Sequence, residues 1–250
     1  MVHFVGAGPG AVDLITVRGM ELLKKADVVI YAGSLVNPAL LEYVKPGCGI
    51  YNSAYMDLEE VIEVIKNSKG EVIRLHTGDP SLFGAVKEQM DILDKEGIEY
   101  DVVPGVSSMF AAAAALKAEY TLPGLSQSVI ITRAEGRTKV PKGQELSSMA
   151  AHNATLVLFL SSGMAGKVSD ELQEGGYSKD TAVAVVYKAS WPEEQIIRTT
   201  VGSLKEDMES AGIFKTALII VGDVLDHEYE YSKLYDKNFT TGYRAGKDRS

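Results

Sequence analysis

Short apolar runs recur along the chain and are separated by stretches whose apolar residues are spaced like one face of a helix. Most of these runs lack the two-residue alternation of a strand that faces solvent, so they predict buried strands in sheets covered on both faces. The predicted strands are 2–5, 28–31, 72–75, 100–103, 129–132, 154–160, 182–187, 196–200 and 217–221.

Between these runs, helical spacing and capping residues predict helices. In TVRGMELLKKA (16–26) the apolar residues fall on one face, and Thr16 precedes the first turn. Asp57 and Ser107 can cap two further helices, and Asp79 followed by Pro80 predicts a helix that runs to Gly97. The predicted helices are 16–26, 38–44, 57–67, 80–96, 109–118, 165–173 and 204–210.

This alternation of strands and helices predicts an α/β protein. The segment EYTLPGLSQ (119–127) is polar, contains a Pro-Gly pair and precedes a restart of the pattern, so we expect a domain boundary there. The expected division is an N-terminal α/β domain over 1–120, a C-terminal α/β domain over 121–228 and a polar tail over 229–250.

Composition excludes several classes of protein. The net charge of −9 argues against general nucleic-acid binding. No apolar run approaches the roughly 18 residues of a membrane-spanning helix, and the N-terminal MVHFVGAGPG does not resemble a signal peptide. The single cysteine, Cys48, forms no internal disulfide and fits the cytoplasm. Four scattered histidines show no metal-ligand spacing, so we expect no protein-bound metal.

Three loops that follow predicted strands carry the candidate chemistry. GAGPGA (6–11) formally fits the dinucleotide pattern G-x-G-x-x-A. However, residues 12–15 intervene before the helix, Pro9 removes an N–H from the loop, and no acidic residue follows the strand at 28–31 to bind a ribose. Nicotinamide binding is therefore the weaker interpretation, and close backbone approach to another ligand remains open.

The second and third loops are GDPSLFG (78–84) and PGVSS (104–108). Each follows a predicted strand, and open α/β sheets bind small molecules in the crevice at the carboxyl ends of their strands. Taken alone, each is better explained as an ordinary turn whose polar side chain caps a helix.

Together, GAGPGAVDLITVRG (6–19), GDPSLFG and PGVSS, in this order and at these spacings, resemble the tetrapyrrole (corrin/porphyrin) methylase family over nearly the whole chain. Within the family, the stretches 30–36, 132–138 and 232–236 are similar to the branch that methylates C11 of precorrin-4.

The resemblance implies two α/β domains that hold S-adenosylmethionine in the cleft between them, and a homodimer. It also implies which positions face this cofactor. Two of them, Leu160 and Thr216, depart from the residues often found there in the family, Met and Pro. The cofactor-facing positions are Pro9, Gly78, Asp79, Leu82, Ser107, Ser108, Leu160, Ala189, Thr216 and Ala217.

The implied reaction is transfer of the sulfonium methyl group to C11 of precorrin-4, or of its cobalt complex, in cobalamin biosynthesis. No residue is singled out as catalytic. The substrate carries acetate and propionate carboxylates, which guanidinium groups bind bidentately. The candidates to bind them are Arg18, Arg133, Arg137 and Lys188, of which two lie in the basic loop RAEGRTKVPKG (133–143).

Several alternatives stay open. The substrate can be uroporphyrinogen III or another precorrin, or a protein if the chain belongs to the diphthine-forming branch. A nicotinamide-dependent oxidoreductase built on residues 6–11 is a further alternative, as is a module that binds S-adenosylmethionine without turnover.

Overall fold

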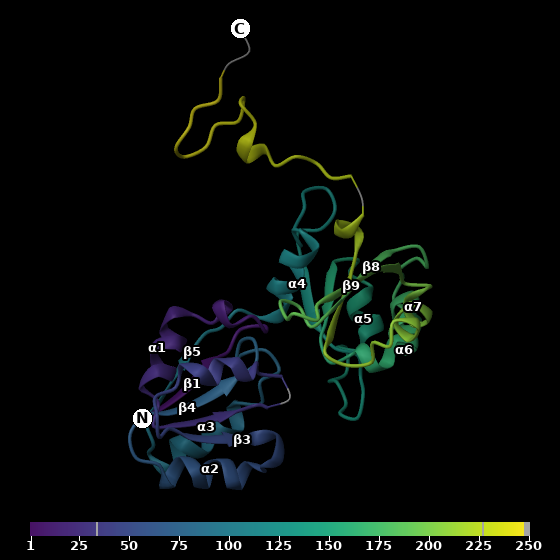
Figure 1. The fold of residues 1–250 in the computed structure, drawn as a ribbon. Coiled ribbons are helices and arrows are strands. Elements are labelled where there is room, and N and C mark those ends of the chain that lie inside the picture. The colour runs from purple at the N-terminus through teal and green to yellow at the C-terminus, as the bar shows by residue number, and fades with distance from the viewer. Residues whose placement is uncertain (34, 227, 248–250) are drawn as a thin grey trace. The chain divides into compact units, whose positions relative to one another are not determined.

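The computed structural model describes residues 1–33, 35–226 and 228–247, which form two five-stranded sheets with helices between the strands (Figure 1). Ser34, in the 30–36 stretch, and the last three residues of the expected tail lie outside the described residues. Residue contacts divide the chain into a first unit, Met1–Leu116 with Val186–Ile196, and a second unit, Lys117–Val185 with Ile197–Ser250. The expected N-terminal domain, 1–120, did not include the returning segment 186–196.

The first unit contains a parallel sheet with strand order β3-β2-β4-β1-β5. Three neighbouring strands start in register, since Val2 of β1 lies opposite Val72 of β4 and Tyr100 of β5. The carboxyl ends of these three strands therefore lie at one edge of the sheet. The strands are β1 (Val2–Gly6), β2 (Val28–Tyr31), β3 (Gly49–Asn52), β4 (Val72–His76) and β5 (Tyr100–Val103).

Helices cover both faces of this sheet, as the apolar runs predict. On one face, Val5 and Ile73 share a buried cluster with Leu23 of α1. On the other face, Phe4 packs in a cluster that contains residues from α2 and α3, such as Ile62 and Leu93. The helices of this unit are α1 (Val17–Lys25), α2 (Leu58–Asn67), α3 (Lys87–Glu96) and α4 (Ser108–Leu116), with 3₁₀ turns at Val12–Leu14, Pro38–Tyr43 and Ser53–Tyr55.

Capping residues set several of these helix ends. The Thr16 side chain accepts a hydrogen bond from Gly19 N at 3.1 Å, so α1 begins after Thr16 as predicted. Asp57 and Glu60 form a capping box at the start of α2. Gly97 ends α3 in the left-handed conformation, with φ of 66°.

Two predicted helices in this unit are wrong in part. The segment 38–44 forms a 3₁₀ turn, and α3 begins at Lys87 instead of Pro80. Phe83 and Ala85 have φ values of 54° and 49°, outside the right-handed helical region, so no helix runs through them. Gly84 packs so closely that an added Cβ would lie 2.2 Å from Pro80 O.

The second unit contains a sheet with strand order β6-β7-β10-β8-β9, in which β7 pairs parallel with β6 and antiparallel with β10. Its strands match the predicted runs closely, whereas the short helix α5 was not predicted. The strands are β6 (Val129–Thr132), β7 (Thr155–Leu158), β8 (Ala182–Tyr187), β9 (Gln195–Thr200) and β10 (Ala217–Val221); the helices are α5 (Leu146–Ala150), α6 (Ala165–Glu174) and α7 (Leu204–Ser210).

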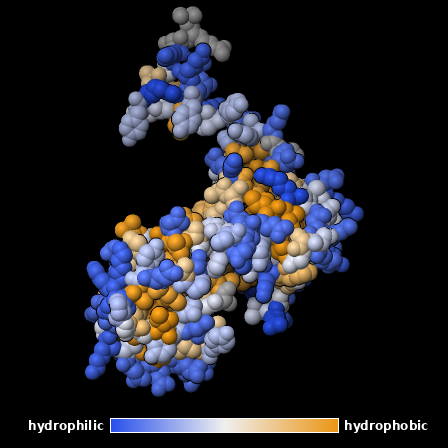
Figure 2. Space-filling view, viewed as in Figure 1, coloured by the Kyte–Doolittle hydropathy of each residue, from blue (hydrophilic) through white to orange (hydrophobic). Residues whose placement is uncertain are grey.

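The surface is mixed in character. Figure 2 shows hydrophilic residues over much of the visible face, with hydrophobic patches on both units. Within the described ranges, no helix is long and apolar enough to span a bilayer.

Candidate functional site

The three loops singled out in the sequence meet at the carboxyl edge of the first sheet. Gly8, in the glycine-rich loop after β1, forms a two-way backbone bridge with Gly78, which follows β4: Gly8 N lies 3.3 Å from Gly78 O, and Gly78 N lies 2.8 Å from Gly8 O. Ala7 N also donates to His76 O at 2.7 Å. The third loop, after β5, packs against both, so the structure brings these motifs together as the strand register requires.

Glycines make this meeting possible. An added Cβ on Gly6 would lie 2.5 Å from Gly105 Cα, and one on Gly105 would lie 2.2 Å from Gly78 O. Such distances are far below van der Waals contact, so larger side chains would force the loops apart. The three loops therefore pack backbone against backbone at this edge of the sheet.

Asp79 ties the second loop to the third. Its carboxylate accepts a hydrogen bond from Gly105 N at 2.8 Å, and others from Ser81 N at 2.9 Å and the Ser81 hydroxyl. Burial raises the pKa of Asp79, but the hydrogen bonds from Ser81 and Gly105 outweigh it and leave the pKa below its ordinary value. Asp79 is thus an ionised linker between loops and caps no helix, contrary to the sequence prediction.

The segment after Asp79 is held from behind by a buried arginine that sequence reasoning missed. The Arg74 guanidinium donates to Gln89 Oε1 at 3.0 Å and to Ile30 O at 3.2 Å, and Gln89 Nε2 donates to Ala85 O at 2.9 Å. This chain of bonds connects β2, β4 and α3 to the left-handed residue Ala85 and thereby fixes the segment that carries Leu82. The missed signal was a charged residue inside an apolar strand.

His76 lies on the same face of β4 and is 4% exposed. Burial, with the nearby Arg74 charge, lowers the pKa of His76 to about 3, and burial lowers the pKa of Arg74 to about 10. His76 is therefore neutral at pH 7, and its Nε2 has no hydrogen-bond partner among the described residues. The ring stacks on Phe4 with centroids 6.0 Å apart, which gives it a packing role.

The remaining predicted cofactor positions of the first unit lie at or beside these loops. Pro9 is buried in the glycine-rich loop, and Ser107 is 3% exposed just before α4, which begins at Ser108. Ala189 is 5% exposed and groups with this unit through the returning segment. Its neighbour Lys188 has a φ of 46°.

The predicted positions of the second unit share one edge of its own sheet. Leu160 lies just after β7 and Ala217 begins β10; the antiparallel register, with Ile219 opposite Leu158, brings these ends together. Leu160 and Thr216 have φ values of 52° and 57°, and Leu160 is 65% exposed. Left-handed conformations at non-glycine residues are costly and are found disproportionately at functional sites.

The four predicted substrate-binding cations differ in how far their charges are already engaged. Arg18 forms an ion pair with Asp101 at 2.7 Å although its side chain is 66% exposed. Arg133 donates to the carbonyl oxygens of Ala134, Thr138 and Lys139, and so holds its own loop.

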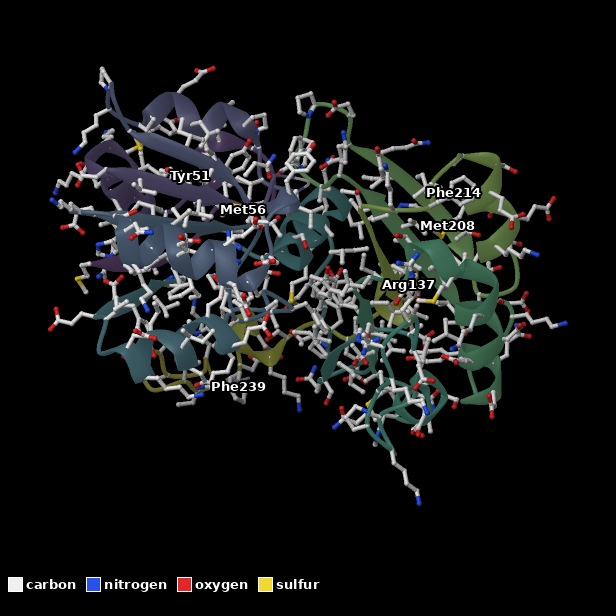
Figure 3. All side chains as sticks on the ribbon, turned by 90° about the horizontal axis from the view of Figure 1, so that it is seen from below. Tyr51, Met56, Arg137, Met208, Phe214 and Phe239 are labelled. Atoms are coloured by element: carbon white, nitrogen blue, oxygen red, sulfur yellow. The ribbon has the colours of Figure 1, made fainter. Side chains whose placement is uncertain are left out.

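Arg137 and Lys188 are less constrained. Arg137 is exposed in the same basic loop, and no hydrogen bond or ion pair engages its guanidinium within the part of the chain that the structure describes (Figure 3). Lys188 Nζ lies 3.5 Å from a Glu193 carboxylate oxygen and faces the rings of Tyr187 and Trp191.

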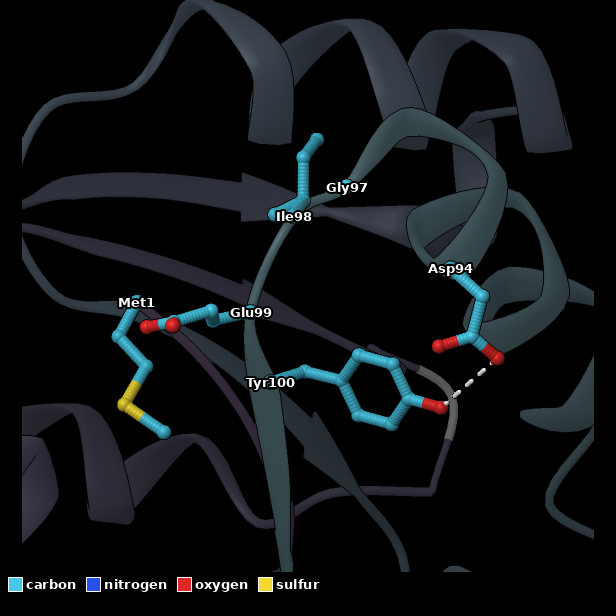
Figure 4. A pocket seen from close by; sticks show the side chains of 6 residues that line it. All are labelled: Met1, Asp94, Gly97, Ile98, Glu99 and Tyr100. Carbon is cyan, nitrogen blue, oxygen red and sulfur yellow. Dashed lines mark hydrogen bonds between the residues drawn. The ribbon is translucent and has the colours of Figure 1, made fainter.

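Three other features are weaker candidates for a functional site than the three loops. A hollow of about 760 Å³ is bordered by Met1, Asp94 and Tyr100, and Tyr100 donates to Asp94 at 3.2 Å (Figure 4). It lies at the amino ends of β1 and β5, the edge opposite to the one where α/β sheets bind ligands. Burial raises the pKa of the Cys48 thiol, which argues against a nucleophile there. In the described ranges, no three His, Cys, Asp or Glu side chains cluster to hold a metal.

Comparisons with known proteins agree with these features. The cobalt-precorrin-4 C(11)-methyltransferase of Methanocaldococcus jannaschii is 56% identical over 97% of this chain and 95% of the relative. That of Priestia megaterium is 50% identical over 98% of both chains. The precorrin-4 C(11)-methyltransferase of Pseudomonas aeruginosa is 43% identical over 98% of this chain and 99% of the relative.

Solved structures show the same fold. The crystal structure of the cobalamin biosynthetic enzyme cobalt precorrin-4 methyltransferase, CbiF, matches with a TM-score of 0.87 and 50% identity, over 90% of this chain and 96% of that chain. A uroporphyrin-III C-methyl transferase from Thermus thermophilus, complexed with S-adenyl homocysteine, matches with a TM-score of 0.77 and 28% identity, over 90% and 93%. The family description "Tetrapyrrole (Corrin/Porphyrin) Methylases" matches residues 1–205. The chain belongs to the tetrapyrrole methylase family.

Proposed function

We propose that this chain is an S-adenosylmethionine-dependent C-methyltransferase that methylates C11 of cobalt-precorrin-4 in cobalamin biosynthesis. The observation that carries the proposal is the convergence of the three glycine-containing loops at one sheet edge, in a chain that matches C11-methyltransferases over almost its full length. The relatives at 50% identity or more are named for the cobalt complex, whereas the P. aeruginosa relative at 43% is named for precorrin-4 itself. This difference favours the cobalt-containing substrate.

The residues present fit the methyl donor. The backbone of Gly6, Gly78 and Gly105 comes close together, with no room for a Cβ at Gly6 or Gly105, so the main chain of the three loops lies at this edge of the sheet. The ionised Asp79 supplies a negative charge beside this surface, which favours a sulfonium cation. Pro9, Gly78, Leu82, Ser107, Ser108 and Ala189 are the proposed contacts in the first unit, and Leu160, Thr216 and Ala217 those in the second.

When bound, S-adenosylmethionine supplies the methyl group: a substrate carbon forms a bond to it while the sulfur–methyl bond breaks and its electron pair returns to sulfur. The protein's main contribution is to orient the two partners and exclude water, which can lower the barrier by about 7–11 kcal/mol. The hydrogen bonds among Gly8, Gly78, Asp79 and Gly105 set that orientation before the donor binds. No side chain needs to act as nucleophile.

For the substrate carboxylates, we propose Arg137 as the principal contact, because its guanidinium is exposed and uncommitted in the described structure. Lys188 is the second, since its bond to Glu193 is long and exchangeable. Arg18 and Arg133 remain candidates, but a substrate carboxylate would have to compete with Asp101 in one case and with the loop carbonyls in the other.

We also propose that the enzyme is a homodimer that works in the cytoplasm. The family resemblance supports the first statement, and the single free cysteine supports the second. Light scattering on the purified chain measures the oligomeric state, and a monomeric mass would overturn that part.

The test is anaerobic turnover with radiolabelled S-adenosylmethionine. Cobalt-precorrin-4, metal-free precorrin-4 and uroporphyrinogen III are offered separately, and the position of the new methyl group is read by NMR. We expect the label at C11 of the cobalt complex, with a higher kcat/KM than for the metal-free substrate. Label only in uroporphyrinogen III, or methylation at another carbon, would refute the assignment.

A further inference from the structure

Pro9–Ala11 of the glycine-rich loop is held by side chains from outside the loop. Pro9 O accepts a hydrogen bond from the Trp191 indole Nε1 at 2.9 Å, and Ala11 N donates to the Ser190 hydroxyl at 3.0 Å. The intervening Gly10 O accepts from Asn37 Nδ2 at 2.8 Å. Two of these three bonds thus come from the β8–β9 loop, which we define as Lys188–Glu194.

The indole also lies directly against the loop. A Cβ added to Gly10 would lie 2.1 Å from Trp191 Cδ1 and 2.2 Å from its Nε1. Gly10 is therefore a glycine because Trp191 occupies the space that a side chain would fill. This contact and the hydrogen bond to Pro9 O fix both the position of the indole and the direction of the Pro9 carbonyl.

The β8–β9 loop is itself fixed by its own hydrogen bonds. Trp191 N donates to Lys188 O at 2.9 Å, Glu194 N donates to Trp191 O at 3.0 Å, and the Glu194 carboxylate accepts from Ser190 N at 2.7 Å. Lys188 and Ser190 have φ values of 46° and 67°, a conformation that costs free energy at non-glycine residues. The strain brings the Ser190 hydroxyl and the Trp191 indole to the glycine-rich loop.

We propose that Trp191, assisted by Ser190, is a positioning residue that holds Pro9–Ala11 in the conformation that binds the methyl donor. The inference deepens the proposed function and rests on it, because Pro9 is one of the proposed donor contacts. Lys188 Nζ lies 5.3 Å from the centre of the Trp191 ring, at a distance typical of a cation–π contact. The same indole thus contacts the glycine-rich loop and Lys188, a proposed substrate-binding cation.

The test uses the full-length enzyme and S-adenosylhomocysteine as the probe. Trp191 is the single tryptophan of the chain, so its fluorescence reports on this contact directly. We expect the emission of the unmodified enzyme to change as the probe binds. Calorimetry gives the dissociation constant for the unmodified enzyme and for the variants Trp191→Phe, which keeps an aromatic ring but loses the N–H donor, and Ser190→Ala.

Loss of one hydrogen bond that orients the loop should raise the dissociation constant roughly fivefold for each variant. The KM for S-adenosylmethionine should rise likewise, with kcat at saturating donor nearly unchanged. The matched control is Tyr177→Phe, which removes a buried hydrogen bond to Ala154 O in the second unit. It should lower the melting temperature without changing probe affinity.

Unchanged probe affinity in both Trp191→Phe and Ser190→Ala, with a normal melting temperature, would overturn the positioning role while leaving the proposed function intact. If Trp191→Phe does not fold, Ser190→Ala alone decides, since it removes only an acceptor at a half-buried position. Failure of the unmodified enzyme to bind the probe would instead refute the proposed function, and the inference with it.

Discussion

Replacing Gly105 by alanine tests the close packing of the three loops. The new Cβ would lie 2.2 Å from Gly78 O and 2.7 Å from Gly6 Cα. Both neighbours are backbone atoms, which cannot rotate away as a flexible side chain can. To reach an ordinary contact of about 3.5 Å, Gly78 O in the loop after β4 would have to move by about 1.3 Å, and Gly6 Cα at the end of β1 by about 0.8 Å.

Overpacking of this kind destabilises a protein by about 1–3 kcal/mol, and we expect the upper end because the clash involves only main chain. For a chain of this size, about 3 kcal/mol corresponds to a fall in the melting temperature of roughly 6–12 °C. The effect on catalysis should be larger, since a displacement of about 1 Å at the proposed donor site can lower kcat/KM on the order of 100-fold.

The assay combines thermal unfolding, S-adenosylhomocysteine binding and turnover. Gly166→Ala is the matched control, because its Cβ would meet only the flexible Lys205 side chain, at 3.2 Å, and alanine suits a helix. The control should keep its melting temperature and activity. A Gly105→Ala enzyme that melts and binds the probe like the unmodified protein would show that the three loops do not pack as described.

Four further variants test the surrounding residues. The pKa of His76 is about 3 in the folded protein and near 6.5 in the unfolded chain, so the unfolded chain binds the proton first as the pH falls. The free energy of unfolding therefore decreases below about pH 6.5, by up to about 1.4 kcal/mol per pH unit. In urea unfolding, the free energy of unfolding should decrease less between about pH 7 and pH 5 for His76→Gln than for the unmodified protein. An equal decrease in the two proteins would contradict this role of His76. Gln89→Met removes the side-chain oxygen that accepts from the buried Arg74 and leaves it only the Ile30 carbonyl, so it should lower the free energy of unfolding by about 2–3 kcal/mol. An unchanged midpoint of chemical denaturation would show that the bond to Gln89 contributes no stability. Arg137→Ala should raise the KM for the tetrapyrrole roughly 10- to 100-fold without lowering the melting temperature. Arg133→Ala should lower the melting temperature, because its loop loses three hydrogen bonds. The reverse pattern would make Arg133 the substrate contact and Arg137 the residue that holds the loop.

Local signals in the sequence were sufficient for many element boundaries. Thr16, Asp57 and Gly97 act within one turn of a helix end, and each sets the end that its residue type predicts. The helix predicted from Pro80 does not form because Phe83 and Ala85 adopt left-handed conformations, although Asp79 still accepts from Ser81 N as a capping residue would. No pattern within residues 78–97 carries that information.

The candidate site was predictable to the extent that it follows from strand order. Parallel strands bring their carboxyl ends to one edge, so the loops at Gly8, Gly78 and Gly105 were expected to meet if β1, β4 and β5 were neighbours. The contribution of Trp191 was not predictable, since it depends on a contact between residues separated by most of the chain. Arg74 could have been noticed, because a charged residue in an otherwise apolar strand requires buried partners.

The contact between Trp191 and the glycine-rich loop has a consequence for synthesis of the protein. Pro9 and Trp191 are separated by 182 residues, so at roughly 5–20 residues per second the ribosome adds Trp191 about 10–40 s after Pro9. All five strands of the first sheet emerge well before that moment, and the sheet can form while its loop still lacks the indole. The proposed donor-binding loop of the nascent chain is therefore completed only after more than half of the second unit has been translated, and a chain that terminates before the β8–β9 loop would carry the sheet with a glycine-rich loop that lacks its indole contact.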